Sequence, residues 1–251
     1  MSNDSLGDRF KAYEKCWDLT VPRRLPLIIR VDGRAFHSLK LEKPFDTDFF
    51  NTMCSVAVYL CQEIQGSVFA YLQSDEISVV ARDDVRLNSE PWVGKRLSKI
   101  NSLSAALATS MFNHRADGLA SRYGIRHFDS RAFCVPDLIE VINYMVWRQQ
   151  DATRNSISMM AHAKFSHKSL QGVSSNGMLD RLREAGEPWE EIKTHFKRGV
   201  ICRPVSYRGS FEGKIVERWK WEIDMETPIF TAERDYLENL YKLPEKILDN
   251  D

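Results

Sequence analysis

The sequence predicts an α+β protein in which helices back a mixed or antiparallel sheet. Short apolar runs at residues 27–31, 68–72 and 77–81 have the length of buried strands. Between the first two runs, and again after residue 99, apolar residues recur at helical spacing. The resulting order is strand, helix, hairpin, helix, strand and helix, which is typical of α+β proteins. Several architectures share this order, so it does not define a function.

The first strand and helix are the most clearly marked elements. Residues 27–31 form an apolar run between a proline and Gly33, which predicts a buried central strand. Asp46 or Thr47 can cap the start of the following helix, and Gly66 can end it. The apolar residues of this helix are Phe49, Met53, Val56, Leu60 and Ile64.

A hairpin and two further helices are predicted next. Residues 68–72 and 77–81 flank the polar segment Gln73-Ser74-Asp75-Glu76, which predicts the hairpin turn. A strand is expected around residues 131–135, and Pro136 then opens a helix. The helix between hairpin and strand is marked by Ile100, Leu103, Leu107 and Met111.

Beyond residue 150 the pattern is weaker. No clean linker interrupts the chain, so we expect a core over residues 1–150 and a C-terminal α/β extension, residues 151–251, packed on it. The elements expected in the extension are helices near 177–185 and 188–198 and strands near 200–207 and 219–225.

The composition indicates a globular protein of a reducing compartment. The 251 residues are 43% hydrophobic and 28% charged, so a sizeable core can be buried. Five cysteines without CxxC spacing argue against a disulfide framework and a zinc site. No run approaches the roughly 20 apolar residues that span a bilayer, and the polar residues 1–15 resemble neither a signal nor a transit peptide. We therefore expect a cytoplasmic protein with no membrane partner.

Charge is unevenly distributed although the net charge is zero. Residues 151–220 hold 13 Lys and Arg against 8 Asp and Glu, whereas residues 223–251 hold 3 against 8. The basic segment suggests a local anionic partner, and a solvated surface explains it equally well.

Acidic residues follow the first strand and occupy the hairpin turn. Asp32 lies just past the run at 27–31, and Asp75 and Glu76 lie at the turn. If the strands are neighbours, these carboxylates meet and repel each other. Mg²⁺ prefers oxygen ligands, and two such ions can activate an attacking oxygen and stabilise a leaving one. We expect Asp32 and Asp75 as the ligands, because Glu76 diverges in regular strand geometry; ordinary turn residues are the alternative.

Residues near these acids are candidates for phosphate binding. Arg30 precedes Asp32 by two residues and so shares its face of the strand. Gly33 lets the main chain approach a ligand and turn its amides toward a phosphate. Lys43, in an expected loop, and Lys99, at the start of a helix, are further candidates for a triphosphate.

At these residues the sequence resembles a known family. Blocks occur in the family's order at residues 29–37, at Lys43-Pro44 with Asp46, and at residues 73–76, 96–99 and 147–152. Together they resemble tRNA-His guanylyltransferase and its guanylyltransferase-like relatives.

This resemblance implies a palm-like catalytic core over residues 1–150, similar to that of conventional polymerases and nucleotide cyclases. It implies a nucleotidyltransferase that extends tRNA in the reverse direction. A 5′-monophosphate on tRNA is activated with ATP or GTP. The 3′-hydroxyl of an incoming nucleotide then attacks the activated 5′ end and releases AMP or pyrophosphate. The family commonly assembles as a homotetramer.

The resemblance also implies the site residues. Two Mg²⁺ ions are expected at Asp32, Gly33 and Asp75, with Glu76 as a further catalytic residue. The nucleotide-binding positions that it implies are Arg30, Gly33, Arg34, Ala35, Phe36, His37, Lys43, Asp46, Ser74 and Lys99.

One block departs from the histidine-tRNA enzymes, which carry His-Ile-Asn-Asn where this chain has Thr153-Arg154-Asn155-Ser156. The missing histidine favours the guanylyltransferase-like branch and template-dependent 5′-end repair. Candidate tRNA contacts are then Arg148, Arg154, Asn155 and Lys164, with surface charges or helix caps as the alternative.

Other functions stay open at this point. A strict tRNA-His guanylyltransferase would add a single G. A palm protein that binds RNA without catalysis is hard to reconcile with three acids at one site. A nucleotide cyclase would leave the basic segment at residues 151–220 without a partner.

Overall fold

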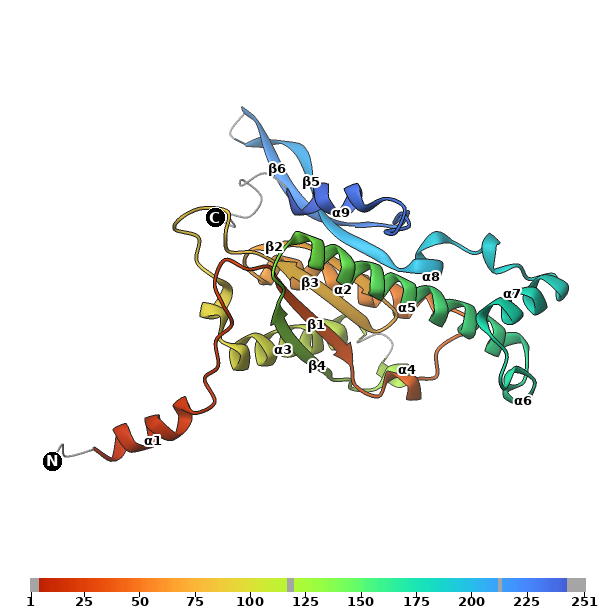
Figure 1. Cartoon of the computed structure of the whole chain (residues 1–251), viewed down its shortest axis with the longest axis horizontal. Helices are drawn as coiled ribbons and strands as arrows, with labels where there is room; N and C mark the ends of the chain where they lie inside the picture. The colour runs from red at the N-terminus through yellow and green to blue at the C-terminus, as the bar shows by residue number, and fades with distance from the viewer. Residues whose placement is uncertain (1–4, 117–119, 212–213, 243–251) are drawn as a thin grey trace.

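The computed structural model describes residues 5–116, 120–211 and 214–242, and these form one six-stranded sheet with helices on both faces (Figure 1). The strand order is β4-β1-β3-β2-β5-β6, and every neighbouring pair is antiparallel. The predicted α+β fold is therefore confirmed, with an antiparallel rather than a mixed sheet. The strands are β1 (Leu27–Gly33), β2 (Ser67–Gln73), β3 (Glu76–Ala81), β4 (Phe128–Cys134), β5 (Val200–Phe211) and β6 (Lys214–Asp224).

Helices pack on both faces of the sheet. In the described part of the chain they are α1 (Leu6–Lys15), α2 (Thr47–Glu63), α3 (Leu97–Arg115), α4 (Ala120–Tyr123), α5 (Leu138–Lys164), α6 (His167–Leu170), α7 (Ser175–Glu184), α8 (Thr194–Arg198) and α9 (Arg234–Tyr241). Short 3₁₀ turns are η1 (Phe36–Ser38), η2 (Trp92–Lys95) and η4 (Trp189–Glu191). None of these helices is both long and apolar enough to cross a bilayer.

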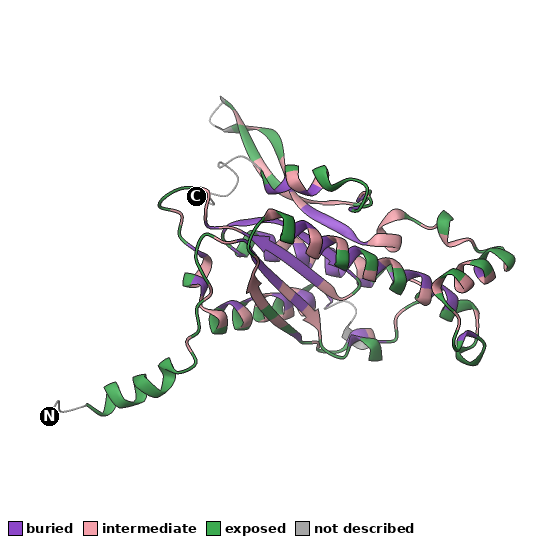
Figure 2. Cartoon of the chain, viewed as in Figure 1, coloured by how far each residue is buried: buried purple, intermediate pink, exposed green. Residues whose placement is uncertain are grey.

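Two apolar cores hold the layers together. The larger lies between α2, α3 and one face of the sheet, where Ile29, Val31 and Met53 have no exposed surface. The second lies on the opposite face, under α5 and α9, where Met145 and Tyr71 are fully buried. Figure 2 shows buried residues concentrated on the central strands, while α1 is exposed along its whole length.

Local chemistry explains the central elements. The Asp46 carboxylate accepts a hydrogen bond from the N–H of Phe49 at 2.9 Å and so caps α2, as the sequence indicates. The hairpin between β2 and β3 turns at Ser74 and Asp75, and Ser74 adopts a left-handed φ of 49°. The end of β1 and this turn therefore lie beside each other.

The helix expected over residues 188–198 is wrong, because η4 and α8 are separated by extended backbone at Ile192 and Lys193. Aromatic contacts hold the two turns on different neighbours. The indole N–H of Trp189 donates to Ser156 on α5 at 2.9 Å, whereas the ring of Phe196 stacks on Phe45 at 4.6 Å. One continuous helix would have to give up one of these contacts.

The expected boundary at residue 150 lies inside the continuous helix α5. Strands β5 and β6 also extend the sheet formed by the first half of the chain. The chain therefore has no break at this position, and the division into core and extension stays a functional prediction.

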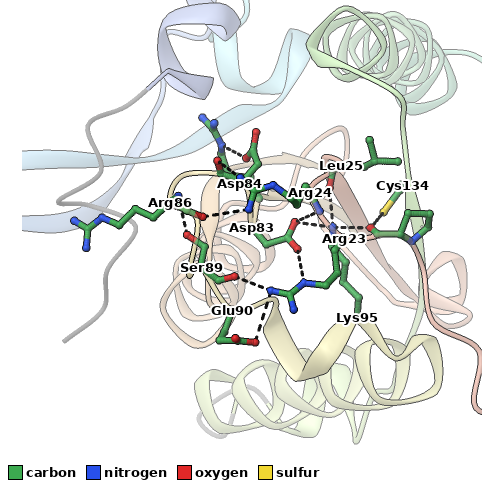
Figure 3. Close-up of polar contacts among 12 residues, drawn as sticks. Arg23, Arg24, Leu25, Asp83, Asp84, Arg86, Ser89, Glu90, Lys95 and Cys134 are labelled. Carbon is green, nitrogen blue, oxygen red and sulfur yellow. Dashed lines mark hydrogen bonds and ion pairs between the residues drawn. The ribbon is translucent and has the colours of Figure 1, made fainter.

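A buried ion pair ties the loops at the far end of β1 (Figure 3). The Lys95 ammonium, 2% exposed, donates to the Asp83 carboxylate at 2.7 Å. It also donates to the carbonyl oxygens of Pro22 and Leu25 at 2.9 and 2.8 Å. All three donors of the ammonium are used, which makes the burial of this charge tolerable.

Candidate active site

The structure brings the carboxylates of Asp32 and Asp75 to one end of the sheet. Asp32 is the last residue but one of β1 and pairs with Glu76 at the start of β3. The N–H of Gly33 donates to the main-chain oxygen of Asp75 at 3.1 Å. The antiparallel pairing of β1 with β3 therefore places the strand end beside the hairpin turn.

The surroundings of the two carboxylates disfavour their charged forms. Burial, followed by the charge of Asp32, raises the pKa of Asp75 to about 6. Burial also raises the pKa of Asp32, with the charges of Glu76 and Asp129 adding to the effect. A cation bound between them would remove this repulsion.

These donors fit Mg²⁺. Within the described ranges, no cluster of three or more His, Cys, Asp and Glu side chains forms a metal site made by protein alone. Mg²⁺ is commonly bound through one or two carboxylates together with substrate phosphates. Asp32 and Asp75, with the main-chain oxygen of Gly33, would hold such ions once a nucleotide triphosphate completes the ligands.

Glu76 lies next to this pair, but its carboxylate is bound by Arg148. Its two carboxylate oxygens accept hydrogen bonds from Nε and a terminal nitrogen of Arg148 at 2.7 and 2.9 Å. Arg148 also donates to Asp151 at 3.0 Å, and its side chain is only 7% exposed. The geometry assigns Glu76 to this ion-pair network, where it orients the hairpin that carries Asp75. Because Arg148 is committed to Glu76 and Asp151, its expected role as a direct tRNA contact is not supported.

The segment after β1 is shaped by close packing. A Cβ on Gly33 would lie 2.6 Å from the ring of Phe36, so the glycine is required for this approach. Phe36 itself is 3% exposed and packs among aromatic rings, so its side chain does not reach a nucleotide. Ala35 adopts a left-handed φ of 58°, which is costly for a residue with a Cβ.

Two main-chain N–H groups of this segment already donate hydrogen bonds within the protein. The N–H groups of Gly33 and Arg34 bond to the carbonyl oxygens of Asp75 and His127. Triphosphate contacts must therefore come from further along the segment or from exposed side chains such as Arg34 and His37. Their nucleotide-binding role stays a prediction.

A cleft of about 680 Å³ opens beside the hairpin turn. Ser74, Asp46 and Asn155, which the sequence singled out, lie on its wall. Much of the remaining wall is aromatic and comes from segments far apart in the sequence: Phe45, Phe49, Phe50, His195 and Phe196. Periodicity marked Phe49 as a helix residue but gave no signal that His195 and Phe196 would join it, because the packing of α8 against α2 brings them together.

Asp46 is buried in a dense hydrogen-bond network. Its carboxylate contacts Arg122 and accepts from the N–H groups of Glu42 and Phe49. Burial alone would raise the pKa of Asp46, but these hydrogen bonds hold it below its usual value. A charged Asp46 at the cleft wall can accept hydrogen bonds from a base only through lone pairs that this network leaves open.

The remaining cationic candidates are scattered. Lys43 is exposed beside the cleft segment. Lys99 lies on the first turn of α3, four residues after the buried Lys95, and so at the opposite end of β1 from Asp32. The structure does not bring Lys99 to the carboxylates of its own chain, and its nucleotide-binding role stays a prediction.

The candidate tRNA contacts on α5 differ in exposure. Arg154 is 56% exposed and pairs with Asp151, while Asn155 is exposed at the cleft. Lys164 is 42% exposed and pairs with Glu187 at 2.6 Å. These three stay predictions.

Comparisons with known proteins identify the family of the chain. The family model described as tRNA(His) guanylyltransferase matches residues 7–136. A bacterial tRNA(His) guanylyltransferase-like protein solved in complex with ATP is 38% identical, with a TM-score of 0.86 over 95% of this chain and 100% of that one. A bacterial protein of the same description in complex with GTP is 36% identical, with a TM-score of 0.83 over 96% and 100%.

A curated relative is tRNA(His) guanylyltransferase 2 of Arabidopsis thaliana, 33% identical over 53% of this chain. The match spans 26% of the length of that relative. These matches identify the class of protein as a nucleotidyltransferase, to which the paired carboxylates and the adjacent cleft are suited. The chain belongs to the tRNA(His) guanylyltransferase family.

Proposed function

We propose that this protein adds nucleotides to the 5′ end of tRNA, using a template-dependent repair reaction after activation of a 5′-monophosphate with ATP or GTP. The observation that carries the proposal is the pair Asp32 and Asp75, partly buried at one end of the sheet beside a cleft. The solved relatives bound to ATP and to GTP support the choice of nucleotides.

The proposed reaction has two steps, activation of the 5′-phosphate and addition of the nucleotide. The 5′-phosphate of the RNA attacks the α-phosphate of ATP, forming an adenylylated 5′ end and releasing pyrophosphate. The 3′-hydroxyl of the incoming nucleotide then attacks the activated 5′-phosphate, forming the new phosphodiester bond and releasing AMP. Bound Mg²⁺ would stabilise the charge that develops on the attacking and leaving oxygens.

The chain's own residues position these groups. Asp32 and Asp75 supply the negative charge that holds the triphosphate's counter-ions in place. Glu76, fixed by Arg148, keeps the hairpin turn against β1. The aromatic wall of the cleft excludes water and packs against the base of the incoming nucleotide.

Template dependence is supported by the missing histidine block. Asn155 and Ser156 occupy part of that block, on the cleft wall. Ser156 accepts the hydrogen bond from Trp189, so the side chains here serve packing as well as the cleft. The expected homotetramer and cytoplasmic location are part of this proposal.

The test uses a 5′-monophosphorylated tRNA that lacks its first nucleotide, with ATP, Mg²⁺ and each labelled nucleoside triphosphate in turn. Addition of only the nucleotide that pairs with the opposing base is the expected result, and changing that base should change the nucleotide added. Addition of G whatever the opposing base, on histidine tRNA alone, would instead identify a strict guanylyltransferase. Nucleotide consumption without RNA would identify a cyclase.

A further inference from the structure

A surface on the open side of β1 and β4 carries charges that the nucleotide cleft does not use. Arg30 lies directly opposite Arg131 in the register of these strands, and Asp32 lies directly opposite Asp129. Directly opposed residues share one face of the sheet with Cβ atoms roughly 5 Å apart. Like charges at such positions destabilise a sheet. The two acids and two arginines offset part of this repulsion, because both arginines attract Asp32 and Arg131 pairs with Asp129.

The two arginines are only partly neutralised. Arg30 approaches Glu76 at 3.8 Å, yet Glu76 already accepts two shorter bonds from Arg148. Within the described residues, the buried Nε of Arg30 has no hydrogen-bond partner. A buried N–H without a partner is costly, and only 16% of the Arg30 side chain is exposed, so the guanidinium reaches this surface with its outer atoms. Arg131 is 52% exposed and pairs with Asp129 on its own strand at 3.2 Å.

Aromatic rings from β4 and α5 border the same surface. Phe133 packs edge-on against Tyr144 at 5.6 Å, and Tyr144 packs edge-on against Trp147 at 5.7 Å. Tyr144 also bonds to Ser78 of β3 at 3.0 Å, which fixes the row over the sheet. Trp147 ends the row and is 48% exposed, with Arg148 stacked on it at 4.4 Å. The indole is thus held rigid by its neighbours while much of it faces solvent.

An exposed indole on the same surface as partly neutralised arginines has the chemistry of a single-stranded nucleic-acid site. Bases stack on such rings whatever their sequence, and arginines contact the phosphates. The sheet order separates this surface from the cleft. The surface lies on β4 and β1, next to β3, whereas the cleft is lined by residues at the end of β2, on the other side of the hairpin turn. The carboxylates of Asp32 and Asp75 lie between the two.

We propose that an unpaired nucleotide at the acceptor end of the RNA binds here, with its base stacked on Trp147 and its phosphate contacting Arg131 and Arg30. The inference rests on the proposed function and extends it. The incoming nucleotide occupies the cleft, and the RNA end reaches the carboxylates from the β4 side. The exposed Trp147 then has a role that the sequence alone did not assign to it.

The test compares binding of a labelled tRNA lacking its 5′ nucleotide with binding of ATP, measured separately on the same variants. Trp147→Ala should weaken RNA binding about tenfold, whereas Trp147→Phe, which keeps a stacking ring, should retain most of it. Arg131→Gln should weaken binding and lower the salt dependence by about one ion. ATP binding should be unchanged in all three. The matched controls are Arg9→Gln, on the exposed helix α1, and Trp17→Ala, in the exposed segment that follows it.

The outcomes separate this inference from the proposed function. If the wild-type protein binds and extends the RNA but Trp147→Ala and Arg131→Gln behave like the controls, the surface is not the RNA site. Equal losses of RNA and ATP binding would indicate a general structural effect and would also overturn it. If the wild-type protein neither binds nor extends tRNA, the proposed function fails and this inference fails with it.

Discussion

Replacing Asp75 with asparagine should stabilise the metal-free protein while removing its activity. Burial and the charge of Asp32 raise the pKa of Asp75 from 3.8 to about 6. Since each pKa unit corresponds to about 1.4 kcal/mol, the charged carboxylate costs the folded state about 3 kcal/mol. Asparagine has nearly the same shape and carries no charge, so it removes this cost.

The sign of the pH dependence follows from the raised pKa. An acid whose pKa is higher in the folded state favours folding when protonated. Its contribution is fully present below its unfolded value of 3.8 and is lost as the pH rises through about 6. The variant should therefore be more stable than wild type by about 3 kcal/mol at about pH 8, and the difference should shrink towards zero near about pH 4.

The assay is urea denaturation in the presence of a chelator across this pH range. Asp129→Asn is the matched control, because Asp129 lies opposite Asp32 but is 56% exposed, and its effect should stay within about 0.5 kcal/mol. Adding Mg²⁺ with nucleotide should stabilise wild type and not the Asp75 variant. A variant that is less stable than wild type at high pH, or a difference that does not change with pH, would refute the electrostatic account.

Three further substitutions test the supports of the site. Arg148→Gln should destabilise the protein by about 3 kcal/mol in urea denaturation and reduce nucleotide addition, because it leaves the buried Glu76 carboxylate without its partner; unchanged stability would contradict this role. Gly33→Ala should cost about 1–3 kcal/mol and weaken nucleotide binding measured by calorimetry, since its Cβ would lie 2.6 Å from the Phe36 ring. Lys95→Met should lower stability by about 3–5 kcal/mol in the same denaturation assay, because it leaves a buried carboxylate uncompensated. If Lys95→Met also abolished the activity of the fraction that stays folded, the ion pair would be more than structural.

Much of the fold could be predicted because its signals are local. The runs that became β1, β2 and β3 are apolar and short, and the polar residues between the last two form the turn. Asp46 caps α2 as its position before the apolar periodicity indicates. The break between η4 and α8 could not be predicted, because contacts with distant aromatic residues produce it.

The candidate site could likewise be predicted only in part. The meeting of Asp32 and Asp75 follows from a strand end and a hairpin turn, so sequence reasoning reaches it. The position of Lys99 depends on the direction in which α3 packs, and the position of Arg148 depends on the register of α5 against β3. Local spacing encodes neither quantity, so sequence reasoning alone could not place Lys99 or Arg148 relative to the carboxylates.

Whether Asp32 and Asp75 form the catalytic pair can be tested by measuring Mg²⁺-dependent nucleotide addition to 5′-truncated tRNA by wild type, Asp32→Asn and Asp75→Asn, with Asp129→Asn as control. We expect each of the first two substitutions to lower the rate about a hundredfold or more, while the control stays near wild type. Addition that persists in both variants, or that proceeds at full rate with a chelator and no metal, would contradict the assignment of these carboxylates as the catalytic pair.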